Sequence, residues 1–422
     1  MKAIALATAL LLMSTGCSKR ETAAEAALLT GPIALGLYRA TLELPGGELP
    51  FGLEILEEGG GYVAHLINGP ERIRVAEVQV GGGRVQMRMP GFENVITARI
   101  DGDELEGELL LVKRDGKDQR IPFAARYGEA YRFVEKPLTD NADVSGRWAA
   151  TFTHPGSGKQ YQAVGELRQS HHQVTGTFLT PTSDHRFLAG DVRDDELELS
   201  TFDGAHAYLY RAKILRGGRL EGTWWSGLAW QESFSARRDD AATLGDAESA
   251  TAMRVAARAL DFTFPDLGGQ PVSLQDPRFT GKVLVVTLGG SWCPNCHDEA
   301  AFLAPYYLQN RERGLEVVAL MFEHFGAFEK AAAATRRFCD RYGIEYATLI
   351  AGISDEEDAA KRLPQLHAVH AFPTTLFIDR AGRVRRIHTG FSGPATGAHH
   401  QRLIEDFDAT VEQLLSETAS GV

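Results

Sequence analysis

A pair of cysteines separated by two residues, Cys293 and Cys296, constrains this chain more than any other feature. The pair follows an apolar run at residues 283–288, which is typical of a buried strand, and precedes a segment with helical spacing. Two cysteines at a strand-to-helix junction can close a small disulfide at the helix N-terminus. There the unpaired backbone N–H groups and the positive end of the helix dipole stabilise a thiolate. Because the thiolate is the species that attacks disulfides, the spacing predicts a redox-active dithiol.

The composition is that of an ordinary globular protein. The chain has 422 residues, of which 44% are hydrophobic and 24% are charged. This length corresponds to about two to four domains. The formal charge of −12 gives no sign of nucleic-acid binding. No run of about 18 apolar residues lies beyond the N-terminus, so we expect no internal membrane span. Four cysteines in all do not make a structural disulfide scaffold.

Residues 1–17 have the pattern of an export signal. Lys2 supplies positive charge, an apolar stretch follows, and two small residues precede Cys17, which resembles a bacterial lipobox whose cysteine becomes lipid-modified. Ser14 stands where that pattern prefers an aliphatic residue, so a cleaved soluble signal is the alternative. Ser18 after the cysteine, by resemblance to Gram-negative sorting patterns, favours the outer membrane over the inner one. Either route leads to the cell envelope and the periplasm, where disulfide chemistry is expected.

Two β-rich blocks follow the tether predicted at residues 18–31. Residues 32–135 consist of short alternating segments separated by glycine-containing turns, and residues 144–238 repeat this style. Three segments of the first block align in order, at a similar offset, with three of the second: 77–87 with 191–199, 103–107 with 218–222, and 121–126 with 232–237. Each copy has room for about eight strands, so we expect two antiparallel barrels or sandwiches.

The pattern changes again after residues 239–258, an alanine-rich and charged stretch that we interpret as a helical linker with few contacts. Residues 259–422 alternate strand-like and helical segments, which is typical of an α/β domain. The expected strands lie at 283–288, 315–321, 347–350, 375–378 and 384–388, and the expected helices at 296–312, 328–342, 356–363 and 399–415. The expected fold class is therefore α+β multidomain, with two β-barrel or sandwich-like repeats before an α/β domain.

Four segments of this last domain resemble the TlpA/ResA group of thioredoxin-like proteins, an extracytoplasmic branch of that superfamily. They are residues 261–267, Gly290 to Cys296, Phe372-Pro373-Thr374 with the strand after it, and Gly382-Arg383-Val384. The resemblance covers a little over a third of the chain. It implies a thioredoxin-like fold for residues 259–422 and dithiol–disulfide exchange with other exported proteins. It further implies net reduction, with electrons from a membrane-bound donor and no bound cofactor.

The resemblance also implies roles for individual residues. Cys293 is expected to cap the helix and to be the attacking thiolate, and Cys296 to resolve the mixed disulfide. Pro294 suits the first helical turn, where a missing N–H costs nothing. Pro373 matches a proline that is cis in the family and faces the disulfide. Phe372 before it replaces the small residue that is more usual there.

Three further positions bear on the site. Trp292 directly precedes the first cysteine and belongs to the matching motif. Glu299, three residues after the second cysteine, matches a family acid linked to thiol reactivity, although an ordinary first-turn helix acid is an equal alternative. The buried acid of ordinary thioredoxins falls at Thr287 in this chain, so we expect that proton relay to be absent.

Other chemistries fit the pattern less well. His297 completes a Cys-x-x-Cys-His pattern typical of c-type haem attachment, but attachment needs a haem-enclosing fold, so we expect His297 on the surface of the first helical turn. A zinc site would need a second ligand pair at suitable spacing, and the sequence has none. A peroxiredoxin-like enzyme is an alternative, although its usual peroxidatic pattern is missing. The non-enzymatic alternative is an envelope protein in which the β repeats bind partners.

The remaining chemically distinctive side chains are expected to be structural. Cys339 lies in a helical pattern and is expected in the core. Three sets of histidines are expected to be exposed and free of metal: 171 with 172, 367 with 370, and 399 with 400. The tryptophans of the second β block are expected in a barrel core or at its mouth: Trp224, Trp225 and Trp230.

Overall fold

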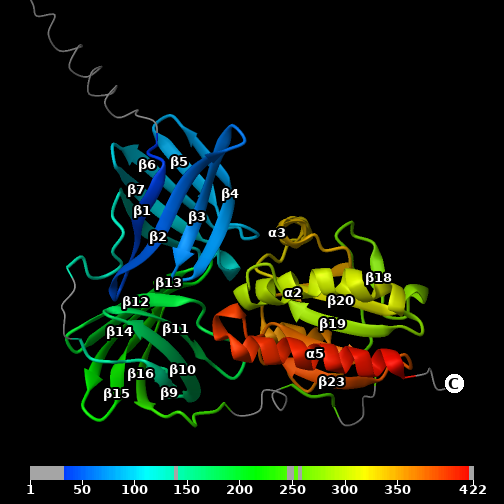
Figure 1. Ribbon diagram of the computed structural model, residues 1–422. Coiled ribbons are helices and arrows are strands. Elements are labelled where there is room, and N and C mark those ends of the chain that lie inside the picture. Colours follow the sequence, from blue (N-terminus) through cyan, green and yellow to red (C-terminus); the bar gives the residue numbers. More distant parts are fainter. Residues whose placement is uncertain (1–32, 137–140, 245–250, 255–258, 418–422) are drawn as a thin grey trace, which may run out of the picture.

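The chain forms three units in contact with one another (Figure 1). The computed structural model describes residues 33–136, 141–244, 251–254 and 259–417. Two closed eight-stranded barrels, blue to cyan and green, lie beside each other, and a yellow-to-red α/β unit packs against them. The expected fold class, two β-barrel-like repeats followed by a thioredoxin-like domain, is confirmed. The export signal with Cys17 and the predicted tether lie outside the described residues.

The first barrel is closed by its first and last strands, since β1 pairs antiparallel with both β2 and β8. Alternate residues of β1 are buried, which is the pattern of a strand with one face in a barrel core. Its strands are β1 (Gly36–Leu44), β2 (Gly47–Glu58), β3 (Gly61–Asn68), β4 (Glu71–Gly81), β5 (Arg84–Arg88), β6 (Val95–Asp101), β7 (Glu104–Leu111) and β8 (Gln119–Tyr127).

The second barrel repeats this design, with β16 pairing back to β9. Its core contains fully buried aromatic side chains, among them Trp148, Phe152 and Tyr210. The three aligned sequence segments fall on equivalent strands of the two barrels, so the predicted repeat is confirmed. The strands are β9 (Gly146–Thr153), β10 (Gln160–Ser170), β11 (Gln173–Leu179), β12 (Leu188–Arg193), β13 (Glu196–Phe202), β14 (Ala207–Leu215), β15 (Arg219–Ser226) and β16 (Trp230–Arg238).

One glycine in each barrel explains part of this sequence repeat. Gly107 in β7 and Gly222 in β15 occupy equivalent positions, where the backbone of the neighbouring strand comes very close. A Cβ atom at either site would collide with a backbone oxygen, that of Thr97 or that of Arg211. Glycine is therefore required by the close approach of the strands, and this requirement marks both copies in the sequence.

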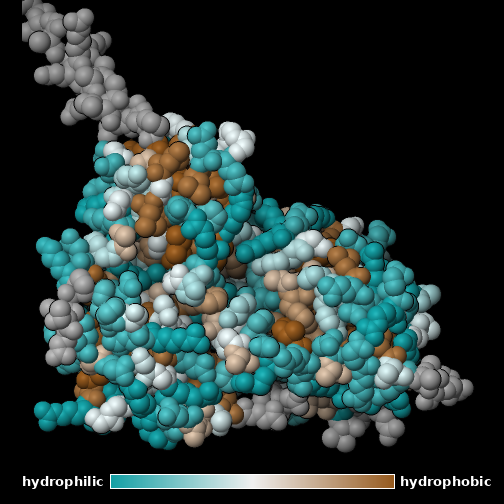
Figure 2. All heavy atoms as spheres, viewed as in Figure 1, coloured by the Kyte–Doolittle hydropathy of each residue, from teal (hydrophilic) through white to brown (hydrophobic). Residues whose placement is uncertain are grey.

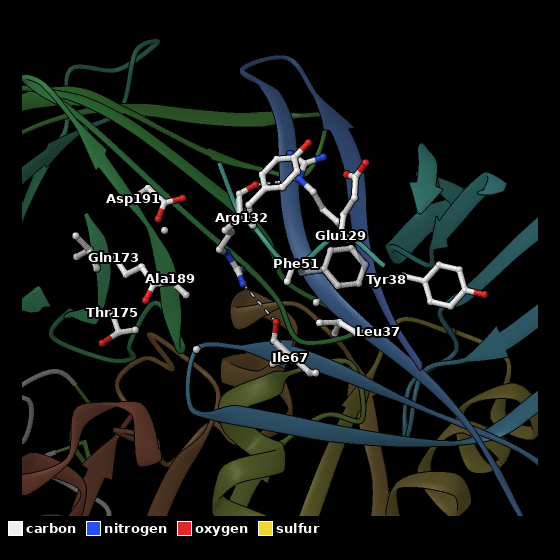
Figure 3. Close-up of a pocket in the computed structure, with 17 residues that line it drawn as sticks. Leu37, Tyr38, Phe51, Ile67, Glu129, Arg132, Gln173, Thr175, Ala189 and Asp191 are labelled. Atoms are coloured by element: carbon white, nitrogen blue, oxygen red, sulfur yellow. Dashed lines mark hydrogen bonds between the residues drawn. The ribbon is translucent and has the colours of Figure 1, made fainter. Parts of the chain in front are cut away.

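The two barrels meet through apolar contacts, such as Phe51 on Phe202, and through polar ones, and they line a half-open cavity of about 300 Å3 (Figure 3). Asn68 of β3 donates a 2.9 Å hydrogen bond to the Phe202 carbonyl of the second barrel. The partly buried Arg132, from the segment that joins the barrels, donates to the Ser200 hydroxyl at 3.0 Å and to the Ser200 carbonyl at 2.9 Å. The barrels therefore form a continuous body, in which Arg132 is part of the cavity wall.

The α/β unit has a five-stranded sheet in the order β21-β20-β19-β22-β23, in which only β22 runs antiparallel to the other strands. Buried side chains of β19 point alternately to two cores, one beneath α2, α3 and α5, the other beneath α4 and the β17–β18 hairpin. The elements are β17 (Thr263–Pro265), β18 (Pro271–Ser273), β19 (Val283–Gly289), α2 (Pro294–Asn310), β20 (Leu315–Glu323), α3 (Phe328–Tyr342), β21 (Ala347–Ile353), α4 (Glu356–Arg362), β22 (Thr374–Ile378), β23 (Val384–Thr389) and α5 (Ala398–Ser416).

The linker prediction is wrong where the structure describes it. Residues 239–244 form a turn instead of a helix, and Ala242 packs with Val164 and Leu179 of the second barrel. Farther on, Met253 forms a bridge to Leu366 of the α/β unit. Alanine content favours helix only weakly, and here packing against both neighbours decides the conformation.

The outer surface is mainly hydrophilic on the face shown in Figure 2, and its largest hydrophobic group lies over the first barrel. Exposed large apolar side chains of that barrel region include Leu35, Leu37 and Tyr127. Within the described residues, no helix combines the length and the apolar composition that a membrane crossing requires.

Candidate active site

The cysteine pair lies at the N-terminus of α2 and forms a disulfide. Cys293 is the N-cap residue, with an extended backbone, and its Sγ accepts a 3.2 Å hydrogen bond from the Cys296 backbone N–H. Pro294 occupies the first helical turn, as predicted. The cap places Cys293 Sγ where the unpaired N–H groups and the helix dipole favour negative charge. The two cysteines are only 5% and 4% exposed.

The turn that precedes β22, the strand paired with β19, faces the disulfide. The Phe372–Pro373 peptide bond is cis, as predicted, and the Phe372 carbonyl oxygen lies 3.5 Å from Cys293 Sγ. Trp292 packs edge-on against the Phe372 ring at 5.9 Å and donates a 2.7 Å hydrogen bond to the Phe322 carbonyl. These contacts hold Trp292 and Phe372 in place next to Cys293. The sulfur of Cys293 therefore lies beside the Phe372 carbonyl oxygen.

Glu299 is a buried acid inside the site and not an exposed helix acid. It is 3% exposed, and its two carboxylate oxygens accept hydrogen bonds from the Thr287 and Thr375 hydroxyls. Burial raises the pKa of Glu299 to about 7. Thr287, where ordinary thioredoxins carry their buried acid, thus donates its hydroxyl to a carboxylate that α2 supplies.

A second buried acid, Glu323 at the end of β20, was not identified from the sequence. Its carboxylate accepts from the Ser291 backbone N–H at 2.9 Å, from the Ser291 hydroxyl at 2.7 Å and from the Thr335 hydroxyl at 3.0 Å. Burial raises its pKa. Glu323 thus holds the loop that leads into the cysteine pair. Its only sequence signal is an acidic residue that ends an otherwise apolar strand.

His297 is buried, and the prediction of a surface position is wrong. Its ring stacks on Phe92 of the first barrel, with centroids 4.1 Å apart. Its Nδ1 lies 2.9 Å from the Tyr342 hydroxyl and its Nε2 lies 2.7 Å from the Ser291 carbonyl oxygen. Burial lowers the pKa of His297 to about 3. Both ring nitrogens therefore have protein partners, an arrangement that leaves none aimed at a haem iron.

The barrels contact the α/β unit extensively, contrary to the expectation of few contacts across residue 240. Phe92 covers His297, and Asn295, which lies between the cysteines, donates to Asp184 of the second barrel at 3.3 Å. Further contacts between the units are Arg186 with Asp298, Arg114 with Asp355, Arg337 with Glu93, and Arg147 with His399. The cysteine pair thus lies beside a three-unit junction and not on an isolated domain.

The other predicted positions are distributed away from the cysteine pair. Cys339 is a free, half-buried thiol packed against the α2–α3–α5 core, and burial raises its pKa to about 11. His399 and His400 are partly buried, contrary to prediction, and His399 Nε2 lies 3.1 Å from Glu166 Oε1. In the described parts of the chain, no group of three or more His, Cys, Asp or Glu side chains is arranged to hold a metal.

The three tryptophans of the second barrel have different environments. Trp224 is buried in the barrel core. Trp225 is partly buried and packs toward the first barrel, whereas Trp230 is 43% exposed beside His154, with ring centroids 4.7 Å apart. The expectation of core or mouth positions therefore describes Trp224 well and Trp230 poorly.

Known proteins resemble the C-terminal part of the chain. Residues 254–399 match the family model described as Redoxin. A protein described as "Thiol-disulfide oxidoreductase ResA" from Halalkalibacterium halodurans is 26% identical over 137 residues, 32% of this chain and 69% of the relative. One of the same description from Geobacillus thermodenitrificans is 29% identical over 140 residues, 33% of this chain and 72% of the relative.

Solved structures also align with this part. A thiol:disulfide interchange protein of the thioredoxin family from Chlorobium tepidum is 20% identical, with a TM-score of 0.30, and the alignment covers 39% of this chain and 100% of that one. The family match and the cysteine pair show that the C-terminal unit contains a Redoxin domain of thioredoxin-like fold. The chain is a thiol–disulfide oxidoreductase.

Proposed function

We propose that this chain is an extracytoplasmic protein disulfide reductase whose redox centre is Cys293 with Cys296. The observation that carries the proposal is the position of Cys293. Its sulfur caps α2, where the backbone N–H groups and the helix dipole stabilise a thiolate, and the turn that precedes β22 faces it. The relatives named as thiol–disulfide oxidoreductases support the same chemistry.

The reaction proceeds in two exchanges. The Cys293 thiolate attacks a partner disulfide, so the partner S–S bond breaks, a mixed disulfide forms and one partner sulfur leaves as a thiolate. Cys296 then attacks Cys293, releases the second partner thiolate and closes the Cys293–Cys296 disulfide. The partner gains two electrons and two protons, and a membrane-bound donor restores the dithiol. Glu299 lies three residues after Cys296 on α2 and has its pKa raised to about 7 by burial, so it is suited to take up or release a proton during the exchange.

Two cysteine variants test the proposal. Cys293→Ser should abolish reduction of insulin disulfides with dithiothreitol as reductant, because the attacking sulfur is lost. Cys296→Ser should instead accumulate mixed disulfides, which mass spectrometry detects, because no resolving thiol remains. Full activity of Cys293→Ser would show that the roles are assigned wrongly. A measured reduction potential near that of thioredoxin, about −270 mV, would favour reduction, and one near about −120 mV would favour oxidation.

The proposed location is the cell envelope, with the protein facing the periplasm and attached to the outer membrane through lipid on Cys17. The export-like pattern of residues 1–17 motivates this, and disulfide chemistry fits an oxidising compartment. Stable attachment needs more than one acyl chain. The partners are then exported proteins with thiols or disulfides, and nucleic acid is not among them.

A second candidate function rests on the barrels. The cavity between them has a mixed wall, with Tyr38 and Phe51 on one side and Arg132 and Asp191 on the other (Figure 3). A pocket of about 300 Å3 with apolar walls and a few polar groups has the character of a small-molecule site. If the barrels have a binding role in the envelope, small molecules should bind in this cavity even when the cysteine pair is inactive. Calorimetry of Cys293→Ser with size-fractionated periplasmic extracts would detect this binding.

A further inference from the structure

A loop of the second barrel lies on the rim of the redox site. Residues 180–187 connect β11 to β12, and the Thr182 carbonyl packs so closely on Gly390 that a Cβ atom added to this glycine would collide with it. The Gly390 N–H in turn donates a 2.7 Å hydrogen bond to the carbonyl of Pro373. The loop is thus separated from the cis prolyl turn by a single residue.

The same loop reaches the residue between the cysteines. Asp184 Oδ2 accepts hydrogen bonds from the Gly393 backbone N–H at 2.7 Å and from the Asn295 side chain at 3.3 Å. Asp184 Oδ1 accepts from the Arg186 backbone N–H at 2.8 Å, a local turn that fixes the loop. Asp184 is 1% exposed, so these bonds are shielded from water.

Arg186 fastens the loop to the redox helix and to both barrels. Its guanidinium pairs with Asp298, the fifth residue of α2, with Asp203 after β13 at 2.9 Å, and with Glu71 of β4 at 3.8 Å. The backbone of Arg186 is left-handed, with φ 62°, an unfavourable conformation for arginine that surrounding contacts must maintain. One side chain therefore joins all three units of the molecule.

The first barrel covers the other side of the cysteine pair. Phe92 stacks on His297, and Asn94 and Lys113 line a small recess together with Trp292. Both barrels therefore flank the first turn of α2, which agrees with the low exposure of the two cysteines. Disulfide exchange requires direct access of the incoming disulfide to the attacking sulfur.

We propose that the loop 180–187, fastened by Arg186, is an intramolecular clamp that keeps bulky protein disulfides from Cys293 and makes Arg186 a specificity-determining residue. The proposal rests on the proposed function of the cysteine pair. In the clamped arrangement the site accepts small disulfides, and protein disulfides react only after the loop has moved away from Gly390 and Asn295. The protein-to-small-disulfide rate ratio therefore measures how often the clamp is open.

Two variants of the full chain open the clamp in independent ways. Arg186→Gln removes the charge that holds Asp298, and Arg186→Lys should partly restore the pairing. Gly393→Ala keeps every charge but places a methyl group against the carboxylates of Asp298 and Asp184. Arg237→Gln is the matched control, since Arg237 is 68% exposed at its side chain and pairs at 2.7 Å with Asp239 away from the redox helix.

The assay compares insulin reduction with reduction of a small aromatic disulfide, both with dithiothreitol, for variants whose circular dichroism matches the wild type. The ratio of the insulin rate to the small-disulfide rate should rise about tenfold or more in Arg186→Gln and in Gly393→Ala. Each variant disturbs a buried contact of the loop 180–187 and so shifts the equilibrium of the loop from closed to open. Arg237→Gln should leave it unchanged. A folded Gly393→Ala with an unchanged ratio, or an equal rise of both rates, would overturn the clamp.

Hydrogen exchange gives a readout that does not depend on activity. The Gly393 N–H, which donates to Asp184, should exchange about tenfold faster in Arg186→Gln than in the wild type. Unchanged exchange would refute the clamp. Failure of the wild type to reduce either disulfide would refute the proposed function instead, while the exchange result would still decide the clamp.

Discussion

The buried carboxyl of Glu299 makes the stability of the Redoxin domain depend on pH in a predictable direction. Its pKa is about 7 in the folded chain against an ordinary value of 4.5. A raised folded-state pKa stabilises the fold fully below pH 4.5, and this stability is lost as the pH rises through 7. The difference of roughly 2.5 units corresponds to about 3 kcal/mol between acidic and alkaline solution. In Glu299→Gln the site cannot ionise, so this part of the pH dependence should disappear.

Urea unfolding followed by the helical circular dichroism signal measures this effect. Within the described residues the α-helices belong to the α/β unit, so the signal reports that unit. The free energy of unfolding of the oxidised wild type should fall by about 2.5 kcal/mol more than that of Glu299→Gln between about pH 5 and about pH 9, because part of the effect is already lost at pH 5. Glu405→Gln, at an exposed site on α5, should behave as the wild type. Equal pH dependence of the wild type and Glu299→Gln would refute the reasoning.

Three other predictions follow from particular contacts. Phe92→Ala removes the ring stacked on His297, so nuclear magnetic resonance should show the His297 pKa rising from about 3 toward 6.5; an unchanged value would contradict burial by the barrel as the cause. Phe152→Ala should lower the stability of the second barrel by about 3–5 kcal/mol in thermal or urea unfolding and spare reduction of small disulfides. Cys17→Ala should release the protein to the soluble fraction, whereas mass spectrometry of an unmodified Cys17 in the wild type would contradict lipidation.

Much of the fold could be predicted because its signals are local. The apolar run of β19, the helical spacing after Cys293 and the glycine-separated strands of the barrels are each visible in short stretches of sequence. The N-cap position of Cys293 follows from the same local logic. The repeat is recognisable in the sequence partly through Gly107 and Gly222, because the neighbouring strand comes too close at both positions for a side chain.

The junction of the three units could not be predicted, because nothing local marks it. Arg186 and Asp298 are separated by 112 positions, and either could equally have been a solvated charge. His297 has the spacing of a surface residue in the first helical turn. It is buried because Phe92 of the first barrel stacks on its ring. For a related reason, the sequence does not decide whether Glu299 is buried, since Thr375, which donates to its carboxylate, comes from β22 much later in the chain.

The closure of each barrel by its first and last strands determines how the chain tolerates being shortened. A start at residue 47 would remove β1 and leave β2 and β8 with unpaired edges, which are templates for pairing with other molecules. The same holds for the second barrel if β9 or β16 is lost. Shortened forms should therefore end between barrels and not within one, and a protease cut inside a barrel should produce aggregates in place of stable fragments.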